Sequence, residues 1–306
     1  MSEDYPRTLM ELETRFQTEA DCLVYLHALR WPEGWQCPRC GGQRAWRMQR
    51  RLWLCGDCGH QTSVLAGTVL QDTKLPLPLW LRAMWQVTSQ KNGLSALGLQ
   101  RVLGLGSYRT AWAMLHKLRR AMVRPGRDRL QGVVEVDETY WGSLETGGPT
   151  GRWIERKTIV AMAVQRDGQG IGRIRLACLP DVQRATLHRF IAQSVEPGNT
   201  VVTDGFNAYR ELNGYTHLRS IQRWQKAEER YLPRVHRVAS LLKRWLLGTH
   251  QGAVGRDHLE DYLNEFTFRF NRRKSASRGK LFYRLAQQAM QVEPAPYASL
   301  IKNRKE

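Results

Sequence analysis

The strongest constraint on the fold of this chain is a pair of CxxC motifs near its N-terminus. Cys37 and Cys40 form the first motif, and Cys55 and Cys58 form the second. Two tight turns can each present two thiolates to one ion, so this spacing predicts a tetrahedral structural zinc site. A glycine follows each pair, where the turn requires an open φ. Two disulfides or a redox-active CxxC are the alternatives, and the lack of a signal-peptide core disfavours both.

The segment between the two cysteine pairs interleaves arginine with tryptophan. In a zinc ribbon this segment forms a β-hairpin with one packed face and one basic face. We expect Trp46 and Trp53 to fill the small core of the ribbon and the arginines to contact DNA phosphates. A solvated basic face is the alternative. The arginines are Arg44, Arg47, Arg50 and Arg51.

The charge of the chain indicates a polyanionic partner. Lys and Arg number 47 against 28 Asp and Glu, which gives a formal net charge of +19. Such an excess favours nucleic acid, with an anionic membrane surface as the rival. No apolar stretch approaches the roughly 20 residues that a bilayer crossing needs. We therefore expect a globular, cytoplasmic and nucleoid-associated protein that binds DNA and no membrane.

Two helical segments separated by a short glycine turn follow the ribbon. The apolar spacing predicts helices over residues 95–103 and 107–122, with Ser107 as the N-cap of the second helix. This outline is typical of a helix-turn-helix, although any two short helices joined by glycine give a similar pattern. The second helix carries a basic surface that we expect to contact DNA. Its cations are Arg109, Lys117, Arg119 and Arg120.

An acid, Asp137, stands in the middle of a run over residues 133–142 that is otherwise typical of a buried strand. Alternation places Glu135 and Asp137 on one face and Val134 on the other. Acids are depleted in strands, so this position is either solvent-facing or held by a cation.

The predicted elements after this run are two further strands, a helix, a strand ending at Asp204, the start of a helix over residues 205–212, another strand and two long helices. This order is that of an RNase H-like α/β domain, in which the first and fourth strands are neighbours. Asp137 and Asp204 would then lie side by side, and two carboxylates repel each other unless a cation lies between them. The pair therefore predicts a magnesium-type site suited to phosphoryl transfer. A simple turn-forming role is the alternative for Asp204, because Gly205 follows it.

These features divide the chain into four expected parts. Residues 1–70 form an N-terminal helix and the zinc ribbon, and residues 71–126 form the helix-turn-helix region. Residues 131–275 form the RNase H-like catalytic domain, and residues 276–306 form a C-terminal tail.

The whole chain resembles bacterial insertion-sequence transposases of the DDE type, which combine an N-terminal zinc ribbon with an integrase-like catalytic domain. The stretches that carry the resemblance are "RWPEGWQCPRCGG", "LWLCGDCGHQTSVLAGT", "VEVDETYWG", "VTDGFNAY", "LLKRWLLGTH" and "YLNEFTFRFNRR". The resemblance implies cleavage at the inverted repeats of the element with Mg²⁺ or Mn²⁺, then joining of the 3′ hydroxyls to target DNA. By this resemblance, Asp137 and Asp204 correspond to the first two acids of the family motif. We also expect the protein to form a homo-oligomer on DNA.

The third position of the family motif departs from the pattern. In the family a carboxylate stands early in the helix after the fifth strand, with Lys or Arg seven residues later. Here Lys243 fills the basic position and His236 stands seven residues before it, two helical turns away on the same face. Neutral imidazole suits Mn²⁺ better than Mg²⁺. We expect His236 to complete the site; the alternatives are a surface histidine, or Glu260, Glu265 or Asn271 as the ligand.

Two other functions fit the same sequence. A zinc-ribbon and helix-turn-helix regulator with an inactive RNase H-like domain would bind DNA without metal dependence. A nuclease or resolvase of the same fold would cleave strands without joining them. A decayed transposase copy would also share these motifs.

Overall fold

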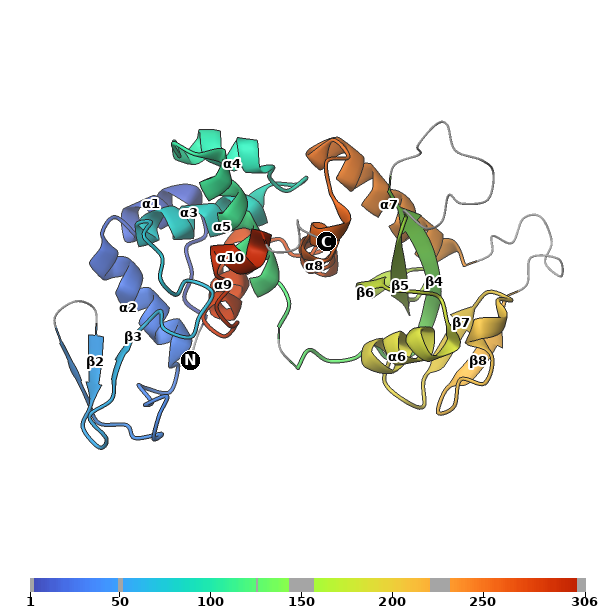
Figure 1. The fold of residues 1–306 in the computed structure, drawn as a ribbon, viewed down its shortest axis with the longest axis horizontal. Coiled ribbons are helices and arrows are strands. Elements are labelled where there is room, and N and C mark those ends of the chain that lie inside the picture. Colours follow the sequence, from blue (N-terminus) through green and yellow to red (C-terminus); the bar gives the residue numbers. More distant parts are fainter. Residues whose placement is uncertain (1–2, 49–51, 125, 143–156, 221–231, 302–306) are drawn as a thin grey trace. The chain divides into compact units, whose positions relative to one another are not determined.

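The computed structural model describes residues 3–48, 52–124, 126–142, 157–220 and 232–301. Contacts within the chain define two compact units (Figure 1). The first unit comprises Met1–Gly126 together with Lys274–Glu306, and the second comprises Arg127–Arg273. None of the described helices combines the length and the apolar character that crossing a bilayer requires.

The first unit begins with two helices and the ribbon sheet. Helix α2 starts with a capping box, in which Thr18 and Asp21 each accept a hydrogen bond from the backbone N–H of the other. At its other end Arg30 Nη1 donates to the carbonyl of Ser63, at 3.1 Å, so α2 is tied to the ribbon. The elements are α1 (Leu9–Arg15), α2 (Glu19–Arg30), β1 (Ala45–Arg47), β2 (Leu52–Cys55) and β3 (Gln61–Ser63), with the three strands antiparallel.

The remaining helices of the first unit include the predicted helix pair. The short turn between α4 and α5 contains Gly104, whose φ of +63° ends α4 in the left-handed conformation. The predicted helix pair is therefore present, with Ser107 at the N-cap of α5. The helices are α3 (Leu77–Ser89), α4 (Ala96–Leu103), α5 (Tyr108–Ala121), α9 (Arg278–Ala289) and α10 (Tyr297–Ile301).

Helix α9 lies in the segment that was expected to form a C-terminal tail. In the structure it packs into the first unit, and the ring of Phe282 stacks on Tyr25 with centroids 6.2 Å apart. Phe282 also lies 5.9 Å from the ring of Trp85 on α3. The first unit is therefore discontinuous in sequence, because the chain returns to it after completing the second unit.

The second unit is built on a five-stranded sheet with the order β6-β5-β4-β7-β8. β4 and β7 are parallel neighbours, whereas β5 is antiparallel to both β4 and β6. This is the RNase H-like arrangement predicted from the order of the elements. The strands are β4 (Val133–Trp141), β5 (Thr158–Asp167), β6 (Gly170–Leu179), β7 (Thr200–Thr203) and β8 (Thr216–Arg219).

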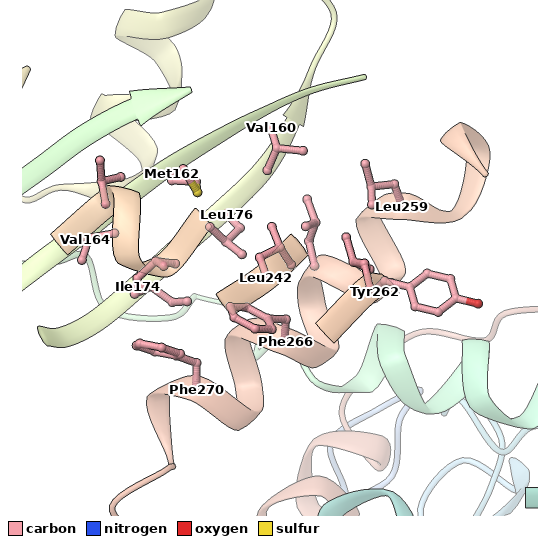
Figure 2. Close-up of a cluster of buried hydrophobic side chains, with 14 of the residues drawn as sticks. Val160, Met162, Val164, Ile174, Leu176, Leu242, Leu259, Tyr262, Phe266 and Phe270 are labelled. Atoms are coloured by element: carbon pink, nitrogen blue, oxygen red, sulfur yellow. The ribbon is translucent and has the colours of Figure 1, made fainter. Parts of the chain in front are cut away.

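Helices cover both faces of this sheet (Figure 1). One face packs against α6 (Arg184–Ser194) through Val134, Val136 and Val201. The other face packs against α7 (Pro233–His250) and α8 (Leu259–Asn271), and Figure 2 shows Met162, Leu176 and Leu242 in this second core. Odd-numbered residues of β4 therefore face α7, and even-numbered residues face α6.

One local expectation was wrong. The segment after β7 was expected to begin a helix, but the structure contains only the single 3₁₀ turn Asn207–Tyr209. The helix cannot propagate because Arg210 is extended, with φ −66° and ψ 154°, and Glu211 has a φ of +61°.

Candidate active site and cysteine cluster

The two aspartates predicted to be neighbours are brought together by the register of the central strands. Glu135 of β4 lies opposite Val202 of β7, where the parallel ladder ends, and Asp137 and Asp204 are each two residues further on. The charge of Asp204 acts on Asp137, so the two carboxylates lie near each other. Asp137 also pairs with Met162, a member of the core under α7. Both carboxylates therefore belong to the face of the sheet that α7 covers.

The electrostatics at Asp137 disfavour its charged form. Burial raises the pKa of Asp137 to about 7, and the charges of Glu138 and Asp204 act in the same direction. The backbone N–H of Glu138 donates to Asp137 Oδ1 at 2.8 Å and opposes the shift. A cation placed between Asp137 and Asp204 would relieve this cost, as expected for a metal-binding pair.

A pH dependence of stability follows from this shift. Because Asp137 has a higher pKa in the folded chain than in the unfolded chain, the folded state binds more protons, and stability falls as pH rises from about 4 to about 7. The shift corresponds to at most about 4 kcal/mol, which solvent screening reduces at this half-buried position. Without added Mg²⁺ or Mn²⁺, Asp137→Asn should therefore unfold at a higher temperature than the wild type at pH 8 but not at pH 4. Thermal unfolding across this range tests the sign, and a constant difference between the two proteins would contradict it.

The other two acids of β4 bind protein groups, and the sequence pattern did not predict these roles. Glu138 faces α6, where its Oε2 accepts a hydrogen bond from the hydroxyl of the buried Tyr209. Because Tyr209 follows Asp204 by five residues, this bond ties the turn after β7 to β4. Burial raises the pKa of Glu138, and the Tyr209 hydroxyl opposes that shift.

Glu135 anchors α7 to the sheet. Its side chain is fully buried, and its Oε2 accepts from the backbone N–H groups of Arg234 and Val235, at 2.9 and 3.0 Å. Its Oε1 lies 3.1 Å from Arg234 Nη1 and 3.3 Å from Arg166 Nε. A carboxylate at the first turn of a helix satisfies orphan N–H groups and complements the helix dipole. The start of α7 is thereby fixed two residues from Asp137 along β4.

His236 and Lys243 both lie on α7, outside its buried stripe of Val235, Val238 and Leu242. Their side chains are exposed, and they are two helical turns apart on one flank of the helix. His236 directly follows Val235, whose N–H is bound by Glu135. Its place at the start of the helix docked on β4 therefore keeps it as the candidate for the third position.

Two of the alternative ligands, Glu260 and Asn271, bind backbone groups of β6. Glu260 Oε2 accepts from the backbone N–H of Cys178 at 2.7 Å, and Asn271 binds both the N–H and the carbonyl of Ile174, at 2.7 and 3.1 Å. In both contacts the side chain binds backbone groups of the edge strand β6, and β5 lies between β6 and β4. Glu260 and Asn271 are therefore removed from the candidates. The remaining alternative, Glu265, is fully buried on α8.

The four ribbon cysteines form a cluster whose sulfur atoms fit one tetrahedral ion. Cys37 Sγ lies 3.7 Å from Cys58 Sγ, and Cys40 Sγ lies 3.6 Å from Cys55 Sγ. A Zn–S bond of about 2.3 Å places the corners of a tetrahedron about 3.8 Å apart, so the spacing matches zinc and excludes disulfides. All four ligand atoms lie within 4.8 Å of one another.

The turns of this cluster have the predicted glycine geometry. Gly41 and Gly59 have φ values of +75° and +68°, and their N–H groups donate to the carbonyls of Cys37 and Cys55. These left-handed residues close each turn after its second cysteine, which turns both thiols of a pair toward the same point.

The ribbon surface differs from the sequence-based expectation at Trp46. This side chain is 58% exposed and does not belong to the small core, whereas Trp53 packs against the core formed with Trp35. Alternation places Trp46 on the face of β1 opposite to Ala45, and Ala45 is the residue of this strand that packs against the small core. Arg47 is exposed on the same strand, and Arg44 is paired with Asp57 at 2.5 Å. Arg50 and Arg51 lie outside the described residues.

The basic residues expected on the second helix of the pair divide by burial. Arg109 is exposed in the first turn of α5, and Lys117 and Arg120 are half-buried. Arg119 is only 1% exposed, and its Nη1 lies 3.4 Å from His116 Nε2. The expectation that Arg119 contacts DNA is therefore wrong, because a buried guanidinium is not accessible to a phosphate.

Comparisons with known proteins agree with this geometry. Residues 129–271 match the model of the ISXO2-like transposase domain, and residues 17–61 match that of the transposase zinc-ribbon domain. A protein of Halobacterium salinarum, described as an uncharacterized protein in transposable element ISH50, is 25% identical over 300 residues, which cover 85% of this chain and 93% of the relative. The chain belongs to the insertion-sequence transposases that combine a zinc ribbon with a DDE-type, RNase H-like transposase domain.

Proposed function

We propose that this transposase is a metal-dependent polynucleotidyl transferase. It binds the inverted-repeat ends of its element, cleaves the DNA there and joins the freed 3′ ends to target DNA. The observation that carries the proposal is the position of Asp137 on β4 near Asp204, which directly follows the adjacent strand β7 and whose charge acts on Asp137. An inert regulatory domain has no need to bring two repelling carboxylates together.

The residues of the site have distinct roles in this proposal. Asp137 and Asp204 supply the hard oxygen ligands that suit Mg²⁺ or Mn²⁺, and His236 adds a ligand from α7. A divalent ion bound there would stabilise the attacking and leaving oxygens of an in-line displacement. Lys243, two turns along α7 from His236, contacts a phosphate of the DNA strand. Glu135 keeps the first turn of α7, which carries His236, docked on β4.

The first unit recognises DNA in this proposal. The cysteine cluster holds structural zinc, which fixes the ribbon and its exposed side chains Trp46 and Arg47. The exposed first turn of α5, with Arg109, enters a groove of the DNA as the start of a recognition helix does. These contacts position the element ends, whereas the second unit performs the chemistry.

The test is an assay with purified protein and labelled DNA that carries the two ends of the element beside a target plasmid. Cleavage at the ends followed by joined products, both requiring added Mg²⁺ or Mn²⁺, is the expected result. The metal should be omitted rather than removed with a chelator, because a chelator would also strip the cysteine cluster. Metal-independent binding with neither product would contradict the proposal, and cleavage without joining would favour a nuclease.

Substitutions at His236 test the third position. His236→Ala should lower cleavage at least tenfold, because a ligand of the metal is lost. His236→Glu should retain or improve activity with Mg²⁺ relative to Mn²⁺, because a hard oxygen replaces the imidazole. His188→Ala, which removes a histidine from α6 on the other face of the sheet, serves as the matched control. Normal cleavage by His236→Ala would show that another residue fills the position, and an inactive Glu265→Gln would identify it.

A further inference from the structure

The second unit contains an open groove of about 810 Å³, and among its described lining residues the proposed function gives a role to Lys243 alone. Its walls are the end of β4, the start of β5, the C-terminal half of α7 and the loop that follows α7. All of these segments belong to one compact unit.

The charge of the groove has one sign. Lys157, Lys243 and Arg256 line it from three different segments, and the described lining residues include no carboxylate. Three cations that converge on one groove repel one another, and binding of an anion relieves that repulsion. A groove of this size and openness suits an extended polyanion better than a single small anion.

The wall that carries Arg256 is held in place by the sheet. Trp141 Nε1 donates to the carbonyl of Val254 at 3.1 Å, which ties the loop after α7 to the end of β4. Gly252 N–H donates to the carbonyl of Leu246 at 3.1 Å, and this bond closes the end of the helix. The cations therefore stand on a scaffold that is ordered before DNA binds, which lowers the entropic cost of binding.

The groove lies further along β4, beyond the aspartate pair. Trp141 is four residues beyond Asp137 on the same face of the strand, a separation of about 13 Å at the usual rise of a strand. Phosphates of one strand of B-DNA advance about 3.4 Å each along the helix axis. A DNA strand whose scissile phosphate lies at Asp137 therefore brings a phosphate roughly four nucleotides away to the groove.

We propose that this groove binds the sugar-phosphate backbone of the DNA strand roughly three to five nucleotides from the cleaved phosphate. Lys157 and Arg256 supply the contacts, beside Lys243. This inference rests on the proposed function, because it takes the position of the cleaved phosphate from the aspartate pair.

The experiment compares two double variants of the full chain that lose the same charge. Lys157→Ala/Arg256→Ala removes two groove cations, and Arg184→Ala/Arg189→Ala removes two exposed cations of α6, on the opposite face of the sheet. The groove variant should bind end DNA at least tenfold more weakly, with the slope of log affinity against log salt flatter by about 1.8, or 0.9 per lost phosphate contact. The α6 variant should retain the affinity and slope of the wild type.

Replacing single phosphates of the DNA by neutral analogues locates the contact with the groove. Single methylphosphonate substitutions along the cleaved strand should weaken wild-type binding most at positions about three to five nucleotides from the cut, and those positions should lose their effect in the groove variant. The inference would be overturned if both double variants weakened DNA binding equally. It would also be overturned if methylphosphonates at the sensitive positions weakened binding of the groove variant as much as they weaken binding of the wild type. Neither outcome contradicts the proposed function. Full activity of Asp137→Asn would instead overturn the proposed function, and the DNA-binding measurements on the two double variants could still be interpreted.

Discussion

Asp137→Asn and Asp204→Asn should each abolish cleavage and strand transfer while leaving folding and end binding intact. Asparagine keeps the shape of the side chain but lacks the charge that a divalent ion requires. We expect a loss of at least about a thousandfold in the cleavage rate, or about 4 kcal/mol of transition-state stabilisation. The measurement is single-turnover cleavage of an end-bearing duplex, with binding followed in the same samples.

A matched control separates a metal ligand from a turn former. Asp204 Oδ1 accepts from the N–H of Phe206 at 2.9 Å, a contact that a simple turn would also make. Asp181 makes the equivalent contact with the N–H of Gln183, at 3.0 Å, in the turn before α6. If Asp204 only forms a turn, Asp204→Asn and Asp181→Asn should have similar small effects. An inactive Asp204→Asn beside an active Asp181→Asn supports the ligand role.

Much of the second unit was predictable because its elements follow hydrophobic alternation and strict connection rules. The order of strands and helices predicted that β4 and β7 would be neighbours, and the register then brought Asp137 and Asp204 together. The glycines after each cysteine pair likewise predicted the two turns of the ribbon. These features depend on short-range pattern and on topology, which a single sequence contains.

The roles of the other acids could not be predicted in the same way. Glu135 and Asp137 share one face of β4, and alternation alone does not distinguish an acid that binds backbone N–H groups from one that binds metal. The partners of Glu135 at the start of α7 are about a hundred residues away in the sequence. The same limit applies to Glu138, whose partner Tyr209 becomes a neighbour only through the pairing of β4 with β7.

Burial on short amphipathic elements was equally hard to predict. Arg119 and Arg120 are adjacent on α5 and point about 100° apart, so only the packing of the helix decides which one is buried. Trp46 and Trp53 fall on different strands of a small hairpin whose core has room for few large side chains. In both cases the composition was basic and aromatic as expected, but the register of the element determined which side chains were exposed.

Cys37→Ser should remove the metal from the ribbon and specific end binding with it. The thiol spacing of 3.6–3.7 Å matches one tetrahedral zinc, and a serine hydroxyl is a much weaker ligand than a thiolate. The small core of the ribbon holds Trp35 with Cys37 and Cys55, so the metal supplies much of its stability. Structural zinc contributes on the order of 10 kcal/mol to the folding of comparable small domains.

The second unit should remain folded after this change, because its core is separate from the ribbon. Wild-type protein purified in reductant should contain about one zinc per chain, and Cys37→Ser should contain far less. Cys178→Ala is the control, since this lone thiol lies on β6 of the second unit and should leave the zinc content unchanged. Metal analysis, end binding and thermal unfolding of both variants complete the test. A zinc-free wild type, or a Cys37→Ser variant that keeps its metal, would show that the four thiols do not share an ion.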